Sequence, residues 1–98
     1  MKEISAKELQ NLLEENKEVN MIDVREVDEV AEGKIPGVVN IPLGLVEARM
    51  HELDQAKEYI MVCRSGGRSG RATEFLESHG FNCINMTGGM LAWEGETE

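Results

Sequence analysis

Residues 59–69 read YIMVCRSGGRS, and within them an apolar run gives way to a loop of small and basic residues. Four consecutive large side chains, at residues 59–62, are typical of a strand that is covered on both faces, as in a parallel sheet. Residues 68–79 have the apolar spacing of an amphipathic helix, which ends at Gly80. Cys63 is therefore predicted at the end of a buried strand, followed by a loop that leads into a helix.

Outward from this stretch, strands and helices alternate along the chain. We expect a helix over residues 6–15, which Ser5 and Glu8 begin with capping-box spacing. The further expected elements are strands at 19–24, 38–41 and 81–86, a helix at 26–32, helical spacing over 43–53 and a short last helix holding Trp93. Such alternation predicts an α/β fold, in which ligands bind beyond the carboxyl ends of the strands.

The size and charge of the chain restrict the classes of function that it can have. Its 98 residues allow one domain. Ten Lys and Arg against 19 Asp and Glu give a net charge of −9, which repels nucleic acids and anionic membranes. Against this background Arg64, Arg68 and Arg71 form a cationic island, with no acidic residue between Glu58 and Glu74. We expect a small anionic ligand and neither a nucleic-acid nor a membrane partner.

The sequence also bears on compartment and cysteine chemistry. No apolar run has the length of a membrane span, and residues 1–10 lack the apolar core of a signal peptide, so we expect a cytoplasmic protein. Cys63 and Cys83 are then expected as reduced thiols. Cys83 has no cationic neighbours and is interpreted as a core residue, with a resolving thiol as the alternative. His51 and His79 have no metal-ligand spacing, and no metal site is predicted.

The loop after Cys63 has the composition of an anion-binding nest. Small residues let several backbone amides point into one concavity, and a helix N-terminus adds positive potential. A cysteine at its edge is stabilised as the nucleophilic thiolate. Lowering a thiol pKa from about 8.5 to about 6.5 requires about 2.7 kcal/mol, whereas a helix terminus supplies about 0.3 to 2 kcal/mol, so the amides must contribute the rest.

Cys63 is accordingly the candidate nucleophile, expected to stand open at the mouth of the loop, with a buried core cysteine beside a tight turn as the alternative. Asp23 and Arg25, at the end of another predicted strand, form either an ion pair that supports the loop or a solvated one. The candidate substrate-binding residues are Arg64, Ser65, Gly66, Gly67, Arg68 and Ser69.

Three ordered motifs resemble those of the single-domain rhodaneses, sulfurtransferases of the thiosulfate type. The first is DVRE at 23–26 with GKIPGV at 33–38 and NIP at 40–42, the second is the loop at 63–69, and the third is GGMLAW at 88–93. The match covers about residues 4–94 of a single domain at 1–98. Lys34 stands where the family usually has His, and Val38 where it usually has Ala, both outside the loop.

The resemblance implies a five-stranded, mostly parallel sheet flanked by helices on both faces. It also implies a ping-pong reaction in which Cys63 takes a sulfane sulfur from thiosulfate or a persulfide and passes it to cyanide, a thiol or a sulfur-relay protein. The amides of residues 64–68 would hold the persulfide, and Arg64 and Arg68 would attract the donor. No metal or organic cofactor is implied.

Two alternatives stay open. Cysteine phosphatases and arsenate reductases have five residues between Cys and Arg, whereas four separate Cys63 from Arg68. A shorter loop forms a narrower cradle, better suited to one sulfur than to phosphate, and the loop contains no Asp to act as general acid. The other alternative is a sulfur carrier or binding module whose partner is another protein.

Overall fold

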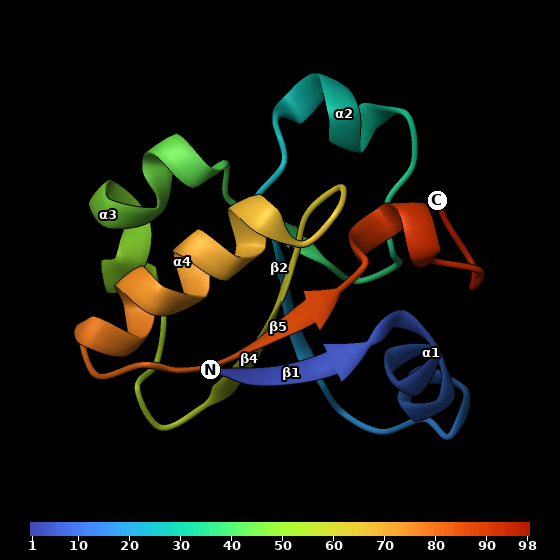
Figure 1. The fold of residues 1–98 in the computed structure, drawn as a ribbon, viewed down its shortest axis with the longest axis horizontal. Coiled ribbons are helices and arrows are strands. Elements are labelled where there is room, and N and C mark those ends of the chain that lie inside the picture. Colours follow the sequence, from blue (N-terminus) through green and yellow to red (C-terminus); the bar gives the residue numbers. More distant parts are fainter.

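Five strands form one sheet, and every pair of neighbouring strands is parallel (Figure 1). The strands are β1 (Lys2–Ser5), β2 (Asn20–Asp23), β3 (Val39–Asn40), β4 (Glu58–Val62) and β5 (Asn82–Thr87). Their order across the sheet is β1-β5-β4-β2-β3, which places β4 at the centre. This computed structural model describes all of residues 1–98. The predicted α/β fold with a five-stranded parallel sheet is confirmed.

Helices follow each of the expected apolar patterns. They are α1 (Ala6–Glu14), α2 (Val27–Ala31), α3 (Val46–Arg49) and α4 (Gly67–Ser78), with 3₁₀ turns η1 (Leu43–Leu45), η2 (Met50–Glu52) and η3 (Gly89–Ala92). At the start of α1 the amide of Glu8 donates to Ser5 Oγ and the amide of Ser5 donates to the Glu8 carboxylate, both at 3.0 Å. The predicted capping box is confirmed, whereas the last helix ends one residue before Trp93.

The residue patterns did not predict β1. This strand lies at the edge of the sheet, where it pairs with β5 from Lys2 beside Ile84 to Ser5 beside Thr87. Lys2 and Glu3 are exposed, so Ile4 is its only large apolar residue. An edge strand with a single apolar residue has no alternation to detect.

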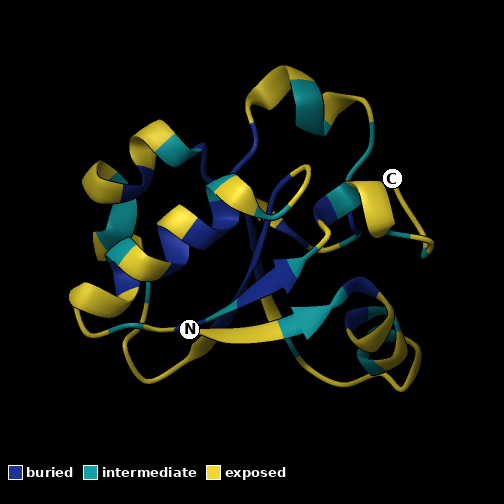
Figure 2. Cartoon of the chain, in the orientation of Figure 1, coloured by how far each residue is buried: buried dark blue, intermediate teal, exposed yellow.

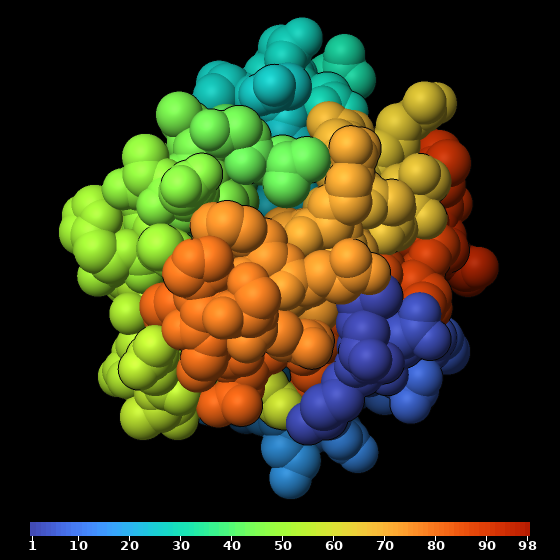
Figure 3. Space-filling model, turned by 60° about the vertical axis from the view of Figure 1, so that its left-hand side comes forward, coloured from blue at the N-terminus to red at the C-terminus, as the bar shows by residue number.

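The sheet is covered on both faces, and alternate residues of β4 serve the two cores. Tyr59 and Met61 belong to the core under α4 and α3, whereas Ile60 and Val62 belong to the core under α1 and η3. All four are buried, as the run of large residues predicted (Figure 2). On the first face α4 lies between the η1–α3–η2 segment and β1 (Figure 3).

The carboxyl end of the sheet carries the loop between β4 and α4. Helix α2 stands beyond the same end and buries none of its residues, so its role is not to cover the sheet (Figure 1). None of the helices combines the length and the apolar character that a membrane crossing requires. Because ligands bind beyond the carboxyl ends of the strands in such sheets, the residues that meet at this end form the candidate site.

Candidate active site

Cys63 follows β4 directly, and its side chain faces the α4 core together with Tyr59 and Met61. The residue is only 1% exposed, so the expectation that it stands open at the loop mouth is wrong. Its sulfur is nevertheless surrounded by donors. The amide of Gly66 donates to Sγ at 3.0 Å and the hydroxyl of Ser69 donates at 3.2 Å. An ordinary core cysteine has no need of such donors, and this arrangement stabilises a thiolate.

These donors shift the acidity of the thiol. Burial is the largest single influence and raises the pKa of Cys63. The hydroxyl of Ser69 and the backbone amides of Ser69, Gly66 and Ser65 together outweigh it, so the pKa lies below its ordinary value. The loop amides thus lower the pKa of Cys63, as predicted, and the hydroxyl of Ser69 lowers it further.

The loop keeps its shape because glycines allow unusual backbone and close approach. Gly66 precedes α4 with φ 106°, a left-handed conformation that favours glycine. Gly89 lies so close to the loop that a Cβ at this position would collide with the backbone of Arg64. The segment after Gly89 holds the loop by two hydrogen bonds, from Met90 N to Cys63 O at 2.9 Å and from Leu91 N to Arg64 O at 3.0 Å. The motif at 88–93 therefore fixes the base of the loop.

Asn85, which we did not single out from the sequence, holds the loop from β5. Its Nδ2 donates to Gly66 O at 3.2 Å, and its Oδ1 lies within hydrogen-bond distance of the Ser69 hydroxyl, whose single proton is donated either to this oxygen or to Cys63 Sγ. Asn85 is 5% exposed, and Gly70 leaves room for its amide. The feature of the sequence that could have identified Asn85 is its polar side chain between the apolar residues Ile84 and Met86, because a buried polar group needs a hydrogen-bond partner. Asn85 thus holds Gly66 in place and competes with Cys63 Sγ for the proton of the Ser69 hydroxyl.

Replacing Ser69 by alanine should raise the pKa of Cys63, because the hydroxyl contributes more to lowering it than any other group. The measurement is the ultraviolet absorbance of the thiolate against pH, in a Cys83→Ser background so that one thiol titrates. Ser65→Ala is the matched control, because Ser65 acts on the sulfur through its backbone amide. A titration of the Ser69 variant that coincides with the control contradicts this role of the hydroxyl.

The two loop arginines differ in their surroundings. Arg64 is exposed and takes part in none of the ion pairs. Arg68 is bound by Glu29 of α2 through both ends of its guanidinium, with Nη1 to Oε1 at 2.7 Å and Nη2 to Oε2 at 2.8 Å. The hydrogen bond from Arg68, with a second from the amide of Glu26, lowers the pKa of Glu29 to about 2. No pattern in the sequence indicated this partner, which lies 39 residues away.

Asp23 and Arg25 form a buried ion pair, which excludes the solvated pair that the sequence left open. Arg25 Nη2 donates to Asp23 Oδ2 and to Gly33 O, each at 2.8 Å, and Asp23 is fully buried. Neither side chain bonds to the loop. The link runs through α2, because Arg25 Nη1 donates to Glu29 O at 3.4 Å and the Glu29 carboxylate binds Arg68. The pair thus anchors the segment that carries Glu29.

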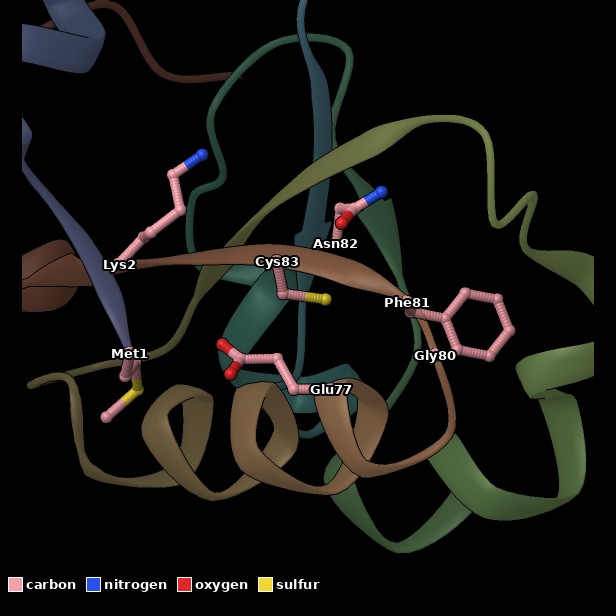
Figure 4. Close-up of a pocket in the computed structure, with 7 residues that line it drawn as sticks. All are labelled: Met1, Lys2, Glu77, Gly80, Phe81, Asn82 and Cys83. Carbon is pink, nitrogen blue, oxygen red and sulfur yellow. The ribbon is translucent and has the colours of Figure 1, made fainter.

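Cys83 lies at the other end of the sheet, beside a surface hollow of about 410 Å³ between β5 and α4 (Figure 4). Its register partner on β4 is Tyr59, four residues before Cys63. At about 3.3 Å per residue the cysteines are about 13 Å apart along the sheet, beyond the reach of a disulfide. Burial, with smaller effects of Glu77 and Glu58, raises the pKa of Cys83 to about 11. Cys83 is therefore a core residue and not a resolving thiol.

The likeness to known proteins agrees with this geometry. The family model for the rhodanese-like domain matches residues 5–96. The chain belongs to the rhodanese-like domain family. This confirms the resemblance drawn from the three motifs. No group of three or more His, Cys, Asp or Glu side chains in the domain is arranged to hold a metal ion.

Several relatives carry names that refer to sulfur. YtwF of Bacillus subtilis, provisionally named a sulfurtransferase, is 48% identical over 98 residues, covering 100% of this chain and 95% of that protein. The sulfurtransferase of Allochromatium vinosum is 34% identical over 92 residues, covering 93% and 86%. The crystal structure of a rhodanese-like domain protein from Staphylococcus aureus has a TM-score of 0.94 at 38% identity, covering 100% and 97%.

Proposed function

We propose that this domain is a sulfurtransferase that carries a sulfane sulfur on Cys63. The observation that carries the proposal is the convergence of the Gly66 amide and the Ser69 hydroxyl on Sγ, with the pKa of the thiol lowered. A thiolate is the form that attacks sulfur, and the same donors favour the negative charge of a persulfide. The sulfur-related names of the relatives support this chemistry.

The reaction has two displacement steps. The Cys63 thiolate attacks the outer sulfur of a donor, an S–S bond forms, and the donor's own S–S bond breaks with its electron pair leaving on sulfite or on a thiolate. A thiol or cyanide then attacks the outer sulfur of the Cys63 persulfide and restores the thiolate. Because Cys63 is 1% exposed, the donor reaches Sγ only when the loop over it moves.

A sulfur-relay role is the second candidate and uses the same persulfide. YrkF of Bacillus subtilis, provisionally named a sulfur carrier protein, is 41% identical over 97 residues, and the match covers 52% of that longer protein. The acceptor in this case is a thiol of another protein. The phosphatase alternative has less support, because Arg68, the arginine that would hold a phosphate, is already bound to Glu29.

Incubation of the pure domain with thiosulfate or an alkyl persulfide should add the mass of one sulfur atom to the peptide that contains Cys63. Cyanide added afterwards should remove that mass and release thiocyanate in equal amount. Mass spectrometry follows the first step and a colorimetric thiocyanate assay the second. Hydrolysis of an aryl phosphate with no sulfur uptake from any donor would support the phosphatase instead.

A further inference from the structure

Arg68, the loop arginine that precedes Ser69, already has an anion supplied by the chain itself. Glu29 binds it with both carboxylate oxygens, and each side chain is 28% exposed. A third contact fixes the carboxylate, because the amide of Glu26 donates to Glu29 Oε1 at 2.9 Å. Two hydrogen bonds in parallel are a specific arrangement, stronger than a loose surface pair. A donor anion that needs Arg68 must therefore compete with Glu29.

Glu29 keeps its negative charge at every pH at which the reaction is measured, because the pKa of this carboxyl is about 2. The cationic charge that the loop offers to a donor is then mainly that of Arg64, which is exposed and forms no ion pair. The domain as a whole carries a net charge of −9. A doubly charged anion is thus repelled by the protein as a whole, and within the loop it meets one arginine without a counterion where the loop sequence contains two.

The two donor classes place different demands on this site. Thiosulfate releases sulfite, so two negative charges gather beside the loop as its S–S bond breaks. An alkyl persulfide, RS–SH, gives its outer sulfur to Cys63 and releases RS⁻, a single charge. The attacking thiolate and the new persulfide are the same in both reactions. A site in which Glu29 neutralises Arg68 therefore stabilises a departing thiolate better than departing sulfite.

We propose that Glu29 determines donor specificity: by holding Arg68 it disfavours donors that release sulfite and selects alkyl persulfides. This inference rests on the proposed sulfur transfer through Cys63. Glu29 touches no donor and acts through Arg68, so it is a positioning residue. Its place on α2, a helix that buries no residue of its own, gives that helix a role at the active site.

The test compares Glu29→Gln with wild type, using thiosulfate and cysteamine persulfide as donors and cyanide as acceptor. Glutamine keeps the hydrogen bond from the Glu26 amide and removes the charge. We expect kcat/KM for thiosulfate to rise about three- to tenfold, through a lower KM, because of the altered local potential. The value for cysteamine persulfide should stay within about twofold of wild type. Asp28→Asn is the matched control, since Asp28 is exposed on the same helix.

Glu29→Asp keeps the negative charge, but its side chain is one carbon too short to keep both hydrogen bonds to Arg68. The value of kcat/KM for thiosulfate should therefore lie between those of wild type and Glu29→Gln. Equal loss with both donors in Glu29→Gln would overturn the inference, as would a rise in Asp28→Asn as large as in Glu29→Gln. If neither donor transfers sulfur to Cys63 even in wild type, it is the proposed function that fails.

A measurement on the wild-type domain is independent of any variant. With Arg68 neutralised, repulsion dominates the approach of thiosulfate, and salt screens it. We therefore expect kcat/KM for thiosulfate to rise with ionic strength. A fall with ionic strength, as for a dianion steered by two free arginines, would overturn the inference.

Discussion

Replacing Cys63 by serine should abolish both the sulfur adduct and the formation of thiocyanate. The serine hydroxyl accepts the same hydrogen bonds from Gly66 and Ser69, but its oxygen stays protonated near neutral pH and forms no persulfide. We expect kcat to fall by about a thousandfold or more, as for other nucleophile replacements. The loss should be the same with thiosulfate and with an alkyl persulfide, since both use this sulfur.

Cys83→Ser is the matched control for this experiment. Cys83 is buried, its pKa is raised to about 11, and it lies at the opposite end of the strands from the loop. The control should keep sulfur uptake at the wild-type level. Thiocyanate formation that persists in Cys63→Ser and disappears in Cys83→Ser would place the carrier sulfur on the wrong cysteine and refute the proposed mechanism.

Replacing Asp23 by asparagine should lower the free energy of unfolding by about 3–5 kcal/mol, because it leaves the Arg25 guanidinium buried without its counterion. Asp23 is fully buried and accepts hydrogen bonds from Arg25 Nε at 3.0 Å and Nη2 at 2.8 Å. The total free energy of unfolding of a small domain is about 5–15 kcal/mol, so the expected loss is a large share of it. Urea denaturation followed by circular dichroism gives the value.

The same substitution at an exposed site is the control. Asp28→Asn removes an equal charge from the neighbouring helix, and its unfolding free energy should change by about 0.5 kcal/mol or less, as for most surface substitutions. A loss in Asp23→Asn below about 1 kcal/mol would mean that water replaces the lost counterion, and that the pair is not an anchor for α2.

The local course of the chain follows from the sequence. The large residues before Cys63 favour a strand that is covered on both faces, as in a parallel sheet. Small residues then leave the backbone amides free, and Gly66 permits the turn into α4. The position of Cys63 at a strand end, beside a nest of amides, is therefore a property of neighbouring residues, and so is the capping of α1 by Ser5.

The contacts that adjust the site come from the tertiary structure alone. Glu29 reaches Arg68, and Asn85 reaches Ser69, only because the order of the strands brings α2 and β5 beside the loop. The burial of Cys63 likewise depends on the packing of α4 against the sheet. Hydrophobic periodicity records which face of an element is covered, but it contains nothing about which distant polar group will lie opposite. The sequence by itself determined the candidate nucleophile and its loop, and the folded sheet determined their counterion, their exposure and their supporting hydrogen bonds.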